Sequence, residues 1–259
     1  MNRLQDKIAL ITGGSRGIGL AMATRFAEEG ADLFLCATNP DRLEEAASEL
    51  RQLGGRVAWG PADVSDRQAV FNMVETALAE FGRIDILVNN AGAYQAARFV
   101  DYTPEDFDRI MKINLYGVFN VTQAVLPGMM ERKKGKIVNI ASTAGKWGSR
   151  NQSAYNASKH AVIGLTRCLG LEAAPLGINV NAICPALVES EMSAPMFAEH
   201  ARMLGIPEDV LRQHLISQIP MQRLLKPGDV ADLAVYLASE ESNNVTCQSL
   251  AVCGGYTMI

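Results

Sequence analysis

Residues 7–19 read KIALITGGSRGIG, a short apolar run followed at once by a glycine-rich turn. The run from Lys7 to Thr12 has the length and apolar character of a strand that is buried on both faces. A helical pattern begins directly after it, at Ile18. Glycines between a strand and a helix let the backbone approach a pyrophosphate, whose charge is favoured by the unpaired N–H groups of the helix N-terminus. The stretch therefore predicts a βαβ fold that binds a dinucleotide.

The glycine spacing is Gly-x-x-x-Gly-x-Gly rather than the more widespread Gly-x-Gly-x-x-Gly. We expect the loop residues to contact the cofactor, namely Gly13, Ser15, Arg16, Gly17, Ile18 and Gly19.

The rest of the chain repeats the alternation of short β-branched runs with longer helical patterns. The expected strands are Lys7–Thr12, Asp32–Ala37, Arg56–Gly60, Ile84–Asn89, Gly135–Ala141, Ile178–Ile183 and Ser249–Val252. The expected helices are Ile18–Glu29, Pro40–Leu53, Asp66–Phe81, Pro104–Arg132, Ala154–Ala173 and Pro227–Ser239. This order predicts an α/β protein with a Rossmann-type doubly wound sheet of seven parallel strands and helices on both faces.

The length of 259 residues, 48% of them hydrophobic, suits one domain that spans residues 1–259. No linker rich in Pro, Gly or Ser interrupts the pattern. About thirty residues from Val188 to Ile219, rich in Met, Glu and Ala, follow the sixth strand, and such an insertion is typical of a lid over a site.

The net charge of −4 provides no long-range attraction to nucleic acid or to an anionic membrane surface. The first residues contain an apolar run too short for a signal peptide, and no later segment approaches membrane-spanning length. We expect a soluble, cytoplasmic protein whose partner is a small molecule.

The end of the second strand predicts which cofactor is used, because an acidic residue there would bind the ribose 2′-hydroxyl of NAD. The segment Cys36-Ala37-Thr38-Asn39 contains no carboxylate, while the guanidinium of Arg16 suits a phosphate. We therefore expect NADP, bound at its 2′-phosphate by Arg16 and Thr38, and leave NAD as the alternative.

Tyr155 and Lys159 are four residues apart, which places them on one face of a helix. A free tyrosine has a pKa of about 10, so proton transfer near neutral pH requires a positive neighbour that lowers it. The ammonium of Lys159 can supply that charge. Ser142, at the end of the fifth strand, can donate to a carbonyl oxygen at the crevice of the sheet, and Asn114 is a polar residue in the middle of a long helix.

These residues, together with Asn89-Asn90-Ala91-Gly92 after the fourth strand, occur in the order and at the spacing of a known family. The chain resembles the short-chain dehydrogenase/reductase family of the classical type over essentially its whole length. The runs Ser142-Thr143-Ala144-Gly145-Lys146 and Val252-Cys253-Gly254-Gly255 are most similar to 3-ketoacyl reductases and aromatic polyketide ketoreductases.

The resemblance implies an oxidoreductase that moves hydride between a nicotinamide cofactor and a carbonyl or secondary alcohol, with no metal. It implies that Tyr155 is the general acid or base, that Lys159 binds the nicotinamide ribose and lowers the tyrosine pKa, and that Ser142 polarises the carbonyl. Asn114 would hold a relay water through a local helix irregularity. Further cofactor contacts are expected from Asp63, Val64, Asn90, Ala91, Gly92, Tyr155, Lys159, Pro185, Val188 and Ser190. Ala186 departs from the Gly that the family usually has after Pro185.

The expected substrate wall comprises Tyr94, Gln95, Trp147, Asn151, Gln152, Val188 and the lid, notably Met192 and Met196. A 3-ketoacyl thioester and a free ketone or polyol remain alternatives, and Arg132-Lys133-Lys134 could receive an acidic carrier protein. A nucleotide-sugar epimerase is disfavoured because the chain has no larger C-terminal substrate domain, and an NADP sensor is disfavoured because Tyr155 and Lys159 are both present.

Small residues on one side of the helix near Ala154–Ala173, including Ala157, Ala161 and Gly164, could pack against a symmetry mate. The family resemblance implies a homotetramer. The five cysteines are scattered and predict buried, reduced thiols. His160, His200 and His214 are isolated and suggest surface or lid residues rather than metal ligands.

Overall fold

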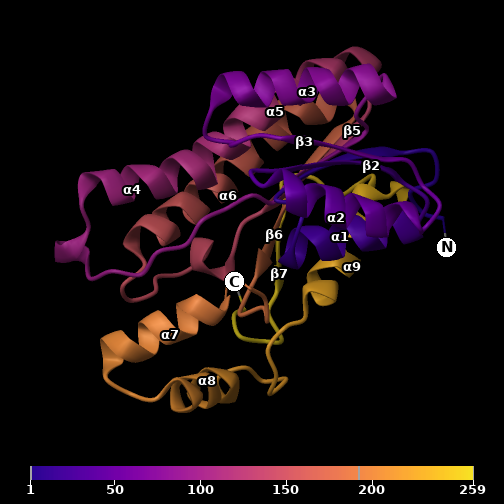
Figure 1. Ribbon diagram of the computed structural model, residues 1–259. Helices are drawn as coiled ribbons and strands as arrows, with labels where there is room; N and C mark the ends of the chain where they lie inside the picture. Colours follow the sequence, from indigo (N-terminus) through magenta and orange to yellow (C-terminus); the bar gives the residue numbers. More distant parts are fainter. Residues whose placement is uncertain (1, 192, 259) are drawn as a thin grey trace.

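The computed structural model describes residues 2–191 and 193–258. The strands are β1 (Ile8–Thr12), β2 (Asp32–Ala37), β3 (Val57–Pro61), β4 (Ile86–Asn89), β5 (Gly135–Ile140), β6 (Ile178–Pro185) and β7 (Ser249–Val252). Within the described residues they form one parallel sheet in the order β3-β2-β1-β4-β5-β6-β7 (Figure 1). The predicted doubly wound sheet is confirmed, and each predicted strand agrees with the observed one to within two residues at either end.

The helices form a layer on each face of the sheet (Figure 1). The principal ones are α1 (Gly17–Glu28), α2 (Pro40–Arg51), α3 (Arg67–Phe81), α4 (Pro104–Met111), α5 (Gly117–Arg132), α6 (Ser153–Ala173), α7 (Ser193–Leu204), α8 (Glu208–Ser217) and α9 (Pro227–Ala238). Side chains of α1, α2 and α9 share one apolar core, and those of α3 and α5 share the other.

Strand β2 shows why the strands read as continuous apolar runs. Leu33 and Leu35 pack into the core under α1 and α9, whereas Phe34 and Cys36 pack into the core under α3 and α5. Successive side chains of a strand point to opposite faces, so a strand covered on both faces buries every residue.

The helix starts follow capping residues that the sequence contains. The Asn39 side chain accepts from the backbone N–H of Arg42 at the start of α2, and the Asp66 carboxylate accepts from Gln68 and Ala69 at the start of α3. Such side chains satisfy N–H groups that have no partner within the helix.

The predicted helix Pro104–Arg132 is not continuous. A π-helical turn, η2 (Lys112–Tyr116), separates α4 from α5 and contains the buried Asn114. This is the local irregularity that the family resemblance implies at Asn114, and π turns inside helices are frequent at functional sites.

The predicted lid consists of α7 and α8, which lie together at the end of the molecule remote from α3 (Figure 1). Val188 pairs with Leu225 just before the lid begins. Met192, a predicted wall residue, lies outside the described residues.

The order of the strands reverses between β1 and β4, which pair with each other while their chain neighbours lead to opposite edges of the sheet. Open α/β sheets bind ligands in the crevice beyond the carboxyl ends of the strands at such a point. The topology therefore locates a candidate site before any side chain is considered.

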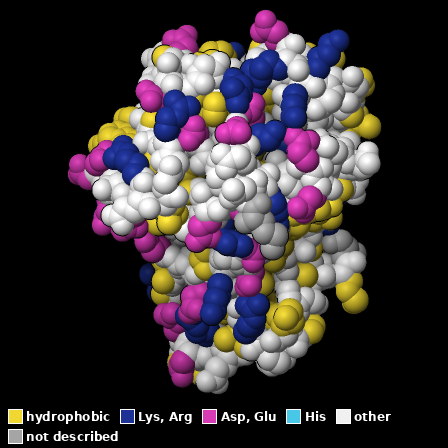
Figure 2. Space-filling view, turned by 90° about the vertical axis from the view of Figure 1, so that its right-hand side faces the viewer, with side chains coloured by type: hydrophobic (Ala, Val, Ile, Leu, Met, Phe, Trp, Pro, Cys, Tyr) yellow, Lys and Arg dark blue, Asp and Glu magenta, His cyan; other side chains and the backbone are white. Residues whose placement is uncertain are grey.

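The surface carries both signs of charge. Figure 2 shows one face on which Lys and Arg side chains lie among Asp and Glu side chains. Within the described residues, no helix is both long and apolar enough to cross a lipid bilayer. All five cysteines are free thiols, but Cys168 is exposed and Cys247 is half-buried, so the prediction of a buried thiol is wrong for Cys168 and holds only in part for Cys247. Cys168 lies on the side of α6 that also exposes Gly164 and Leu171.

Candidate active site

A cavity of about 1110 Å³ lies at the carboxyl ends of the strands, beside the point where their order reverses. Every predicted cofactor contact lines it, as do Ser142, Tyr155 and Lys159. Residues from the glycine loop, the ends of β2, β4 and β5, helix α6 and the lid meet there, although they are far apart in the sequence.

The glycine loop has the backbone conformation that its sequence predicts. Gly13 and Gly17 have φ values of +63° and +55°, which side chains rarely permit. A Cβ on Gly19 would collide with the Gly13 carbonyl oxygen. Helix α1 begins at Gly17 with no side-chain cap and no acidic residue in its first turn. Its first N–H groups can therefore receive the pyrophosphate of a dinucleotide.

Asn90 fixes this loop to the end of β4. Its side-chain amide donates to the carbonyl oxygens of Thr12 and Gly13, at 3.0 and 3.1 Å. The Thr12 hydroxyl in turn accepts from the N–H groups of Asn90 and Ala91. Asn90 thus shapes the loop in addition to lining the cavity, a role that its position in the sequence did not indicate.

Two guanidiniums, rather than the single one expected, lie near the end of β2. Arg16 and Arg42 both line the cavity near Thr38, and each lies 3.1 Å from the same oxygen of Glu191. Arg42 belongs to the first turn of α2. Arg42 was not among the predicted cofactor contacts. Its position four residues after Thr38 could have indicated it, because the first turn of a helix that directly follows a strand lies close to the end of that strand.

Asp63 and Val64 line the cavity after β3, and their contact with an adenine remains a prediction. The Asp63 carboxylate accepts from the backbone N–H and the hydroxyl of Ser65, which holds the turn after β3. The Val64 carbonyl accepts from the amide of Asn120.

The hydroxyls of Ser142 and Tyr155 both line the cavity. The Ser142 oxygen accepts from the backbone N–H of Ala144 at 3.1 Å and lies 3.5 Å from the Pro185 carbonyl oxygen. Burial raises the pKa of Tyr155, and a hydrogen bond with Ser142 opposes that rise. The two side chains therefore face the same point of the cavity, where each can contact one substrate oxygen.

Lys159 is 5% exposed and donates to the carbonyl oxygen of Ile140 at 2.8 Å. Its ammonium lies 5.7 Å from the centre of the Tyr155 ring. Burial lowers the pKa of Lys159 to about 8. A lowering of the Tyr155 pKa by Lys159 remains a prediction for the enzyme with its cofactor bound, because burial raises this pKa in the structure.

Asn114 does not line the cavity, but it contacts segments that do. Its side chain accepts from the Ala93 N–H at 2.7 Å and donates to the Ala93 carbonyl oxygen and to the Ser158 hydroxyl. Ser158 donates to the Tyr155 carbonyl oxygen. Asn114 thereby connects the loop after β4 to the helix that holds Tyr155 and Lys159.

The substrate side of the cavity contains Tyr94, Trp147, Asn151, Gln152, Val188 and Met196, as predicted. Gln95 does not line it, because its side chain accepts from Arg109 and its carbonyl oxygen accepts from Tyr102, so the prediction for Gln95 is wrong. The lid, which was predicted to form part of this wall, also contributes His200, whose Nε2 lies 2.8 Å from the Tyr94 hydroxyl.

Comparisons with known proteins agree with this geometry. The family model described as short chain dehydrogenase matches residues 7–201. This chain belongs to the short-chain dehydrogenase family. One relative is the granaticin polyketide synthase putative ketoacyl reductase 1 of Streptomyces violaceoruber, which is 40% identical over 96% of this chain and 92% of its own length.

Two solved structures of short-chain dehydrogenases are similar throughout. An actinorhodin polyketide ketoreductase variant with NADPH superposes with a TM-score of 0.94 at 38% identity, covering 96% of this chain and 97% of the other. An NAD⁺-bound xylitol dehydrogenase superposes with a TM-score of 0.94 at 35% identity, covering 97% and 99%. This short-chain dehydrogenase is accordingly an oxidoreductase with a Rossmann-type fold.

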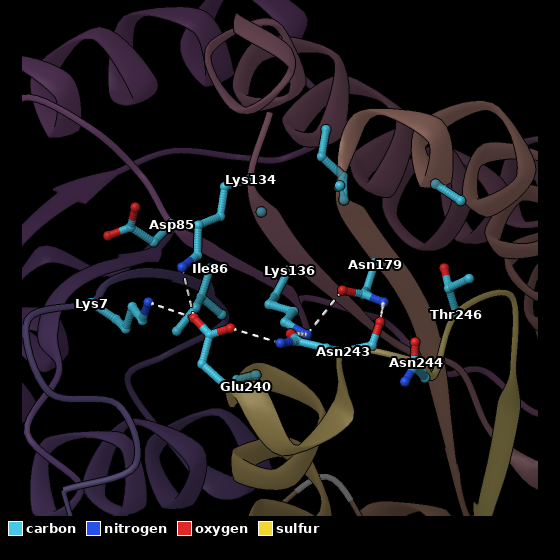
Figure 3. A pocket seen from close by; sticks show the side chains of 15 residues that line it. Lys7, Asp85, Ile86, Lys134, Lys136, Asn179, Glu240, Asn243, Asn244 and Thr246 are labelled. Carbon is cyan, nitrogen blue, oxygen red and sulfur yellow. Dashed lines mark hydrogen bonds and ion pairs between the residues drawn. The ribbon is translucent and has the colours of Figure 1, made fainter. Parts of the chain in front are cut away.

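A second cavity, of about 440 Å³, lies at the opposite, amino end of the sheet (Figure 3). Its lysines already have hydrogen-bond or ion-pair partners. One oxygen of Glu240 lies 3.0 Å from the Lys7 ammonium and 2.8 Å from that of Lys134. Lys136 donates to neutral oxygens of Asn179, Ser242 and Asn243. This cluster ties the starts of several strands to the segment after α9.

The position of this cluster argues against Arg132–Lys134 as the site that receives an acidic carrier protein. Lys134 belongs to the cluster, and Arg132 donates to the Ile84 carbonyl oxygen just before β4. The run Arg132–Lys134 therefore lies at the amino end of the sheet and does not border the entrance of the active-site cavity. The reason is that α5 runs antiparallel to the strands, so its last turn is remote from their carboxyl ends.

Within residues 2–191 and 193–258, no three His, Cys, Asp or Glu side chains are grouped so as to hold a metal ion. His160 lies on α6, whereas His200 and His214 belong to the lid helices and line the cavity.

Proposed function

We propose that this short-chain dehydrogenase reduces a ketone, or a 3-ketoacyl thioester, to a secondary alcohol with a reduced nicotinamide cofactor. The observation that carries the proposal is the common cavity in which Tyr155 and Ser142 face each other at one end while the glycine loop lies at the other. When bound, the cofactor supplies or accepts the hydride.

The residues of the chain supply the proton and the positioning. Tyr155 donates its phenolic proton to the carbonyl oxygen during reduction and accepts it during oxidation. Ser142 donates a hydrogen bond to the same oxygen as negative charge develops on it. The Ala144 N–H and the Pro185 carbonyl oxygen hold the Ser142 hydroxyl in place.

Lys159 binds the nicotinamide ribose and provides the positive charge beside Tyr155. Asn114 holds the helix and the loop together through its side chain, whose amide and carbonyl groups are all engaged. A relay water for the Tyr155 proton would therefore bind to the backbone of the π turn η2 rather than to the Asn114 side chain.

The preferred cofactor in this proposal is NADP(H), with NAD(H) as the alternative. Arg16 and Arg42 offer two guanidiniums near Thr38, and a guanidinium suits the 2′-phosphate. The NADPH-bound ketoreductase and the NAD⁺-bound xylitol dehydrogenase are both relatives, so both cofactors occur in similar folds. Equal catalytic efficiency with both cofactors would overturn this preference.

The second candidate activity is oxidation of an alcohol or polyol. Asn151 and Gln152 place amides on the cavity wall, which suit hydroxyl groups, and the similarity to xylitol dehydrogenase favours it. Arg150, an exposed residue that lines the cavity, could contact an acidic thioester carrier.

The absorbance of the reduced nicotinamide tests these activities directly. Ketones, diketones and ketoacyl thioesters are supplied with either reduced cofactor, and polyols with either oxidised one. We expect rapid oxidation of NADPH with a ketone or ketoacyl thioester. Dinucleotide binding without turnover of any carbonyl or alcohol would favour a sensor instead.

We also propose that the protein is a homotetramer in the cytoplasm. Exposed apolar or small side chains lie on α6 and near the start of α5, including Phe119, Ala157 and Gly164. Such faces can pack against a symmetry mate. The five free thiols suit a reducing compartment. Fractionation of cells that express the protein tests the location.

A further inference from the structure

The carboxylate of Glu191 bridges two guanidiniums that come from separate elements. One oxygen of Glu191 lies 3.1 Å from Arg16 of the glycine loop and 3.1 Å from Arg42 of α2. Glu191 itself belongs to the segment between β6 and the lid helix α7. All three side chains line the active-site cavity.

The bridge makes an anion site that the chain fills with its own carboxylate. Two guanidiniums directed at one oxygen form an arrangement that binds phosphate well. The hydrogen bonds from Arg16 and Arg42 hold the pKa of Glu191 below its ordinary value, so this carboxylate is ionised at neutral pH. A 2′-phosphate that approaches Arg16 and Arg42 therefore meets a negative charge in its place.

The bridge also supplies the group that the end of β2 lacks. In dinucleotide-binding folds, an acidic residue near this point accepts a hydrogen bond from the ribose 2′-hydroxyl of NAD. The segment Cys36–Asn39 contains no carboxylate. Glu191 brings one to the same end of the cavity from the lid side.

We propose that Glu191 is a cofactor-specificity residue, which competes with the 2′-phosphate of NADP(H) for Arg16 and Arg42 and accepts the ribose 2′-hydroxyl of NAD(H). The inference rests on the proposed function, because it presumes that a dinucleotide binds in this cavity. The side chain of Glu191 is 57% exposed, so it can turn into solvent when the phosphate enters. NADP(H) binding then breaks the bridge, whereas NAD(H) binding retains it.

The variant Glu191→Gln removes the negative charge and keeps the shape of the side chain. We expect the Kd of NADPH to fall about fivefold, because NADPH no longer has to break the exposed ion pairs of Glu191 with Arg16 and Arg42. The Kd of NADH should stay the same or rise. Nicotinamide fluorescence or calorimetry measures both constants, and added salt should shrink the NADPH effect because it screens exposed charges.

Glu189→Gln is the matched control. Glu189 lies two residues from Glu191, and its replacement by Gln changes the net charge by the same amount. Its carboxylate pairs with Arg212 at 2.7 Å and does not line the cavity. We expect its ratio of NADH to NADPH Kd values to equal that of the unmodified enzyme. A second variant, Glu191→Gln with Arg42→Ala, should lose the gain in NADPH affinity because one of the two freed guanidiniums is gone.

The inference is overturned if Glu191→Gln leaves the ratio of the two Kd values within about twofold of the unmodified enzyme. It is also overturned if Glu189→Gln changes the ratio equally, since a long-range charge effect would then suffice. If the unmodified enzyme binds neither NADPH nor NADH, the proposed function fails as well. If it binds either cofactor and the ratio does not move, only the role of Glu191 is lost.

Discussion

At the scale of single residues, Lys159 is a buried cation in the candidate active site. Its ammonium is buried, its hydrogen bond goes to a neutral carbonyl oxygen, and burial lowers its pKa to about 8. It therefore remains mostly protonated at neutral pH and can favour the phenolate of Tyr155 once the cofactor is in place.

Replacing Lys159 by Met should change the pH dependence of alcohol oxidation. Oxidation requires deprotonated Tyr155, so its rate rises with pH up to the pKa of that phenol. A nearby positive charge lowers this pKa, and its removal raises it. In Lys159→Met, the rising limb of the pH profile of kcat should thus move to higher pH. The loss of rate should be greatest near neutral pH. An unchanged limb would show that Lys159 does not tune Tyr155.

Lys136 offers a separate test of buried charge, remote from the active site. It is 8% exposed, and burial lowers its pKa to about 8, below the unfolded value of about 10.4. Between these values the unfolded chain binds more protons, so the contribution of Lys136 to stability becomes more favourable as pH rises.

Denaturant unfolding of the unmodified protein and of Lys136→Met measures this effect. The difference between their free energies of unfolding should shift in favour of the unmodified protein from about pH 7 to pH 10. Groups remote from Lys136 that titrate in this range cancel in the difference, whereas Lys7 and Lys134 interact with it. A flat or opposite trend would contradict the assignment of a lowered pKa to Lys136.

At the scale of elements, the turn from β1 into α1 depends on close backbone contact. A Cβ on Gly19 would collide with the Gly13 carbonyl and crowd the Asn90 side chain, which itself holds the loop. We expect Gly19→Ala to destabilise the protein by about 1–3 kcal/mol and to weaken dinucleotide binding more than tenfold.

Gly228→Ala on α9 is the comparison variant for that prediction, because a Cβ there meets nothing within 4 Å. It should leave dinucleotide affinity unchanged and slightly raise the melting temperature, since Ala favours a helix over Gly. Equal tolerance of both substitutions would mean that the glycine loop does not need its observed geometry.

The sequence predicts the elements well because each carries its own local signals. Buried parallel strands read as apolar runs, and caps such as Asp66 mark the helix starts. The candidate site was largely predictable because Gly17, Ser142, Tyr155 and Lys159 occur at characteristic spacings.

Contacts between distant segments were not predictable in this way. Arg16, Arg42 and Glu191 meet only because the lid folds back over the glycine loop, and no local pattern links residues 149 positions apart. His200 approaches Tyr94 for the same reason. Gln95 was assigned to the wall from its place beside Tyr94, but its side chain accepts a hydrogen bond from Arg109 instead.

At the scale of the whole molecule, the proposed tetramer would bury apolar side chains that are exposed on a single chain. Phe119 and Tyr116 are 42% and 55% exposed near the start of α5. Because a symmetric interface uses each residue in several copies, one charged substitution should disrupt it strongly. We expect light scattering to give a tetramer for the unmodified protein and a smaller species for Phe119→Glu.

Leu53→Glu is the control for that experiment, because Leu53 is 44% exposed after α2, on the other face of the sheet. It should leave the tetramer intact. A monomeric unmodified protein at micromolar concentration would contradict the proposed assembly.

The central claim concerns one phenolic oxygen, and Tyr155→Phe tests it most directly because the variant removes that atom and keeps the ring. With a substrate identified in the carbonyl screen, we predict that kcat falls by about a thousandfold or more while the Kd of NADPH changes less than about twofold. Turnover that survives undiminished in Tyr155→Phe would contradict the assignment of Tyr155 as the proton donor.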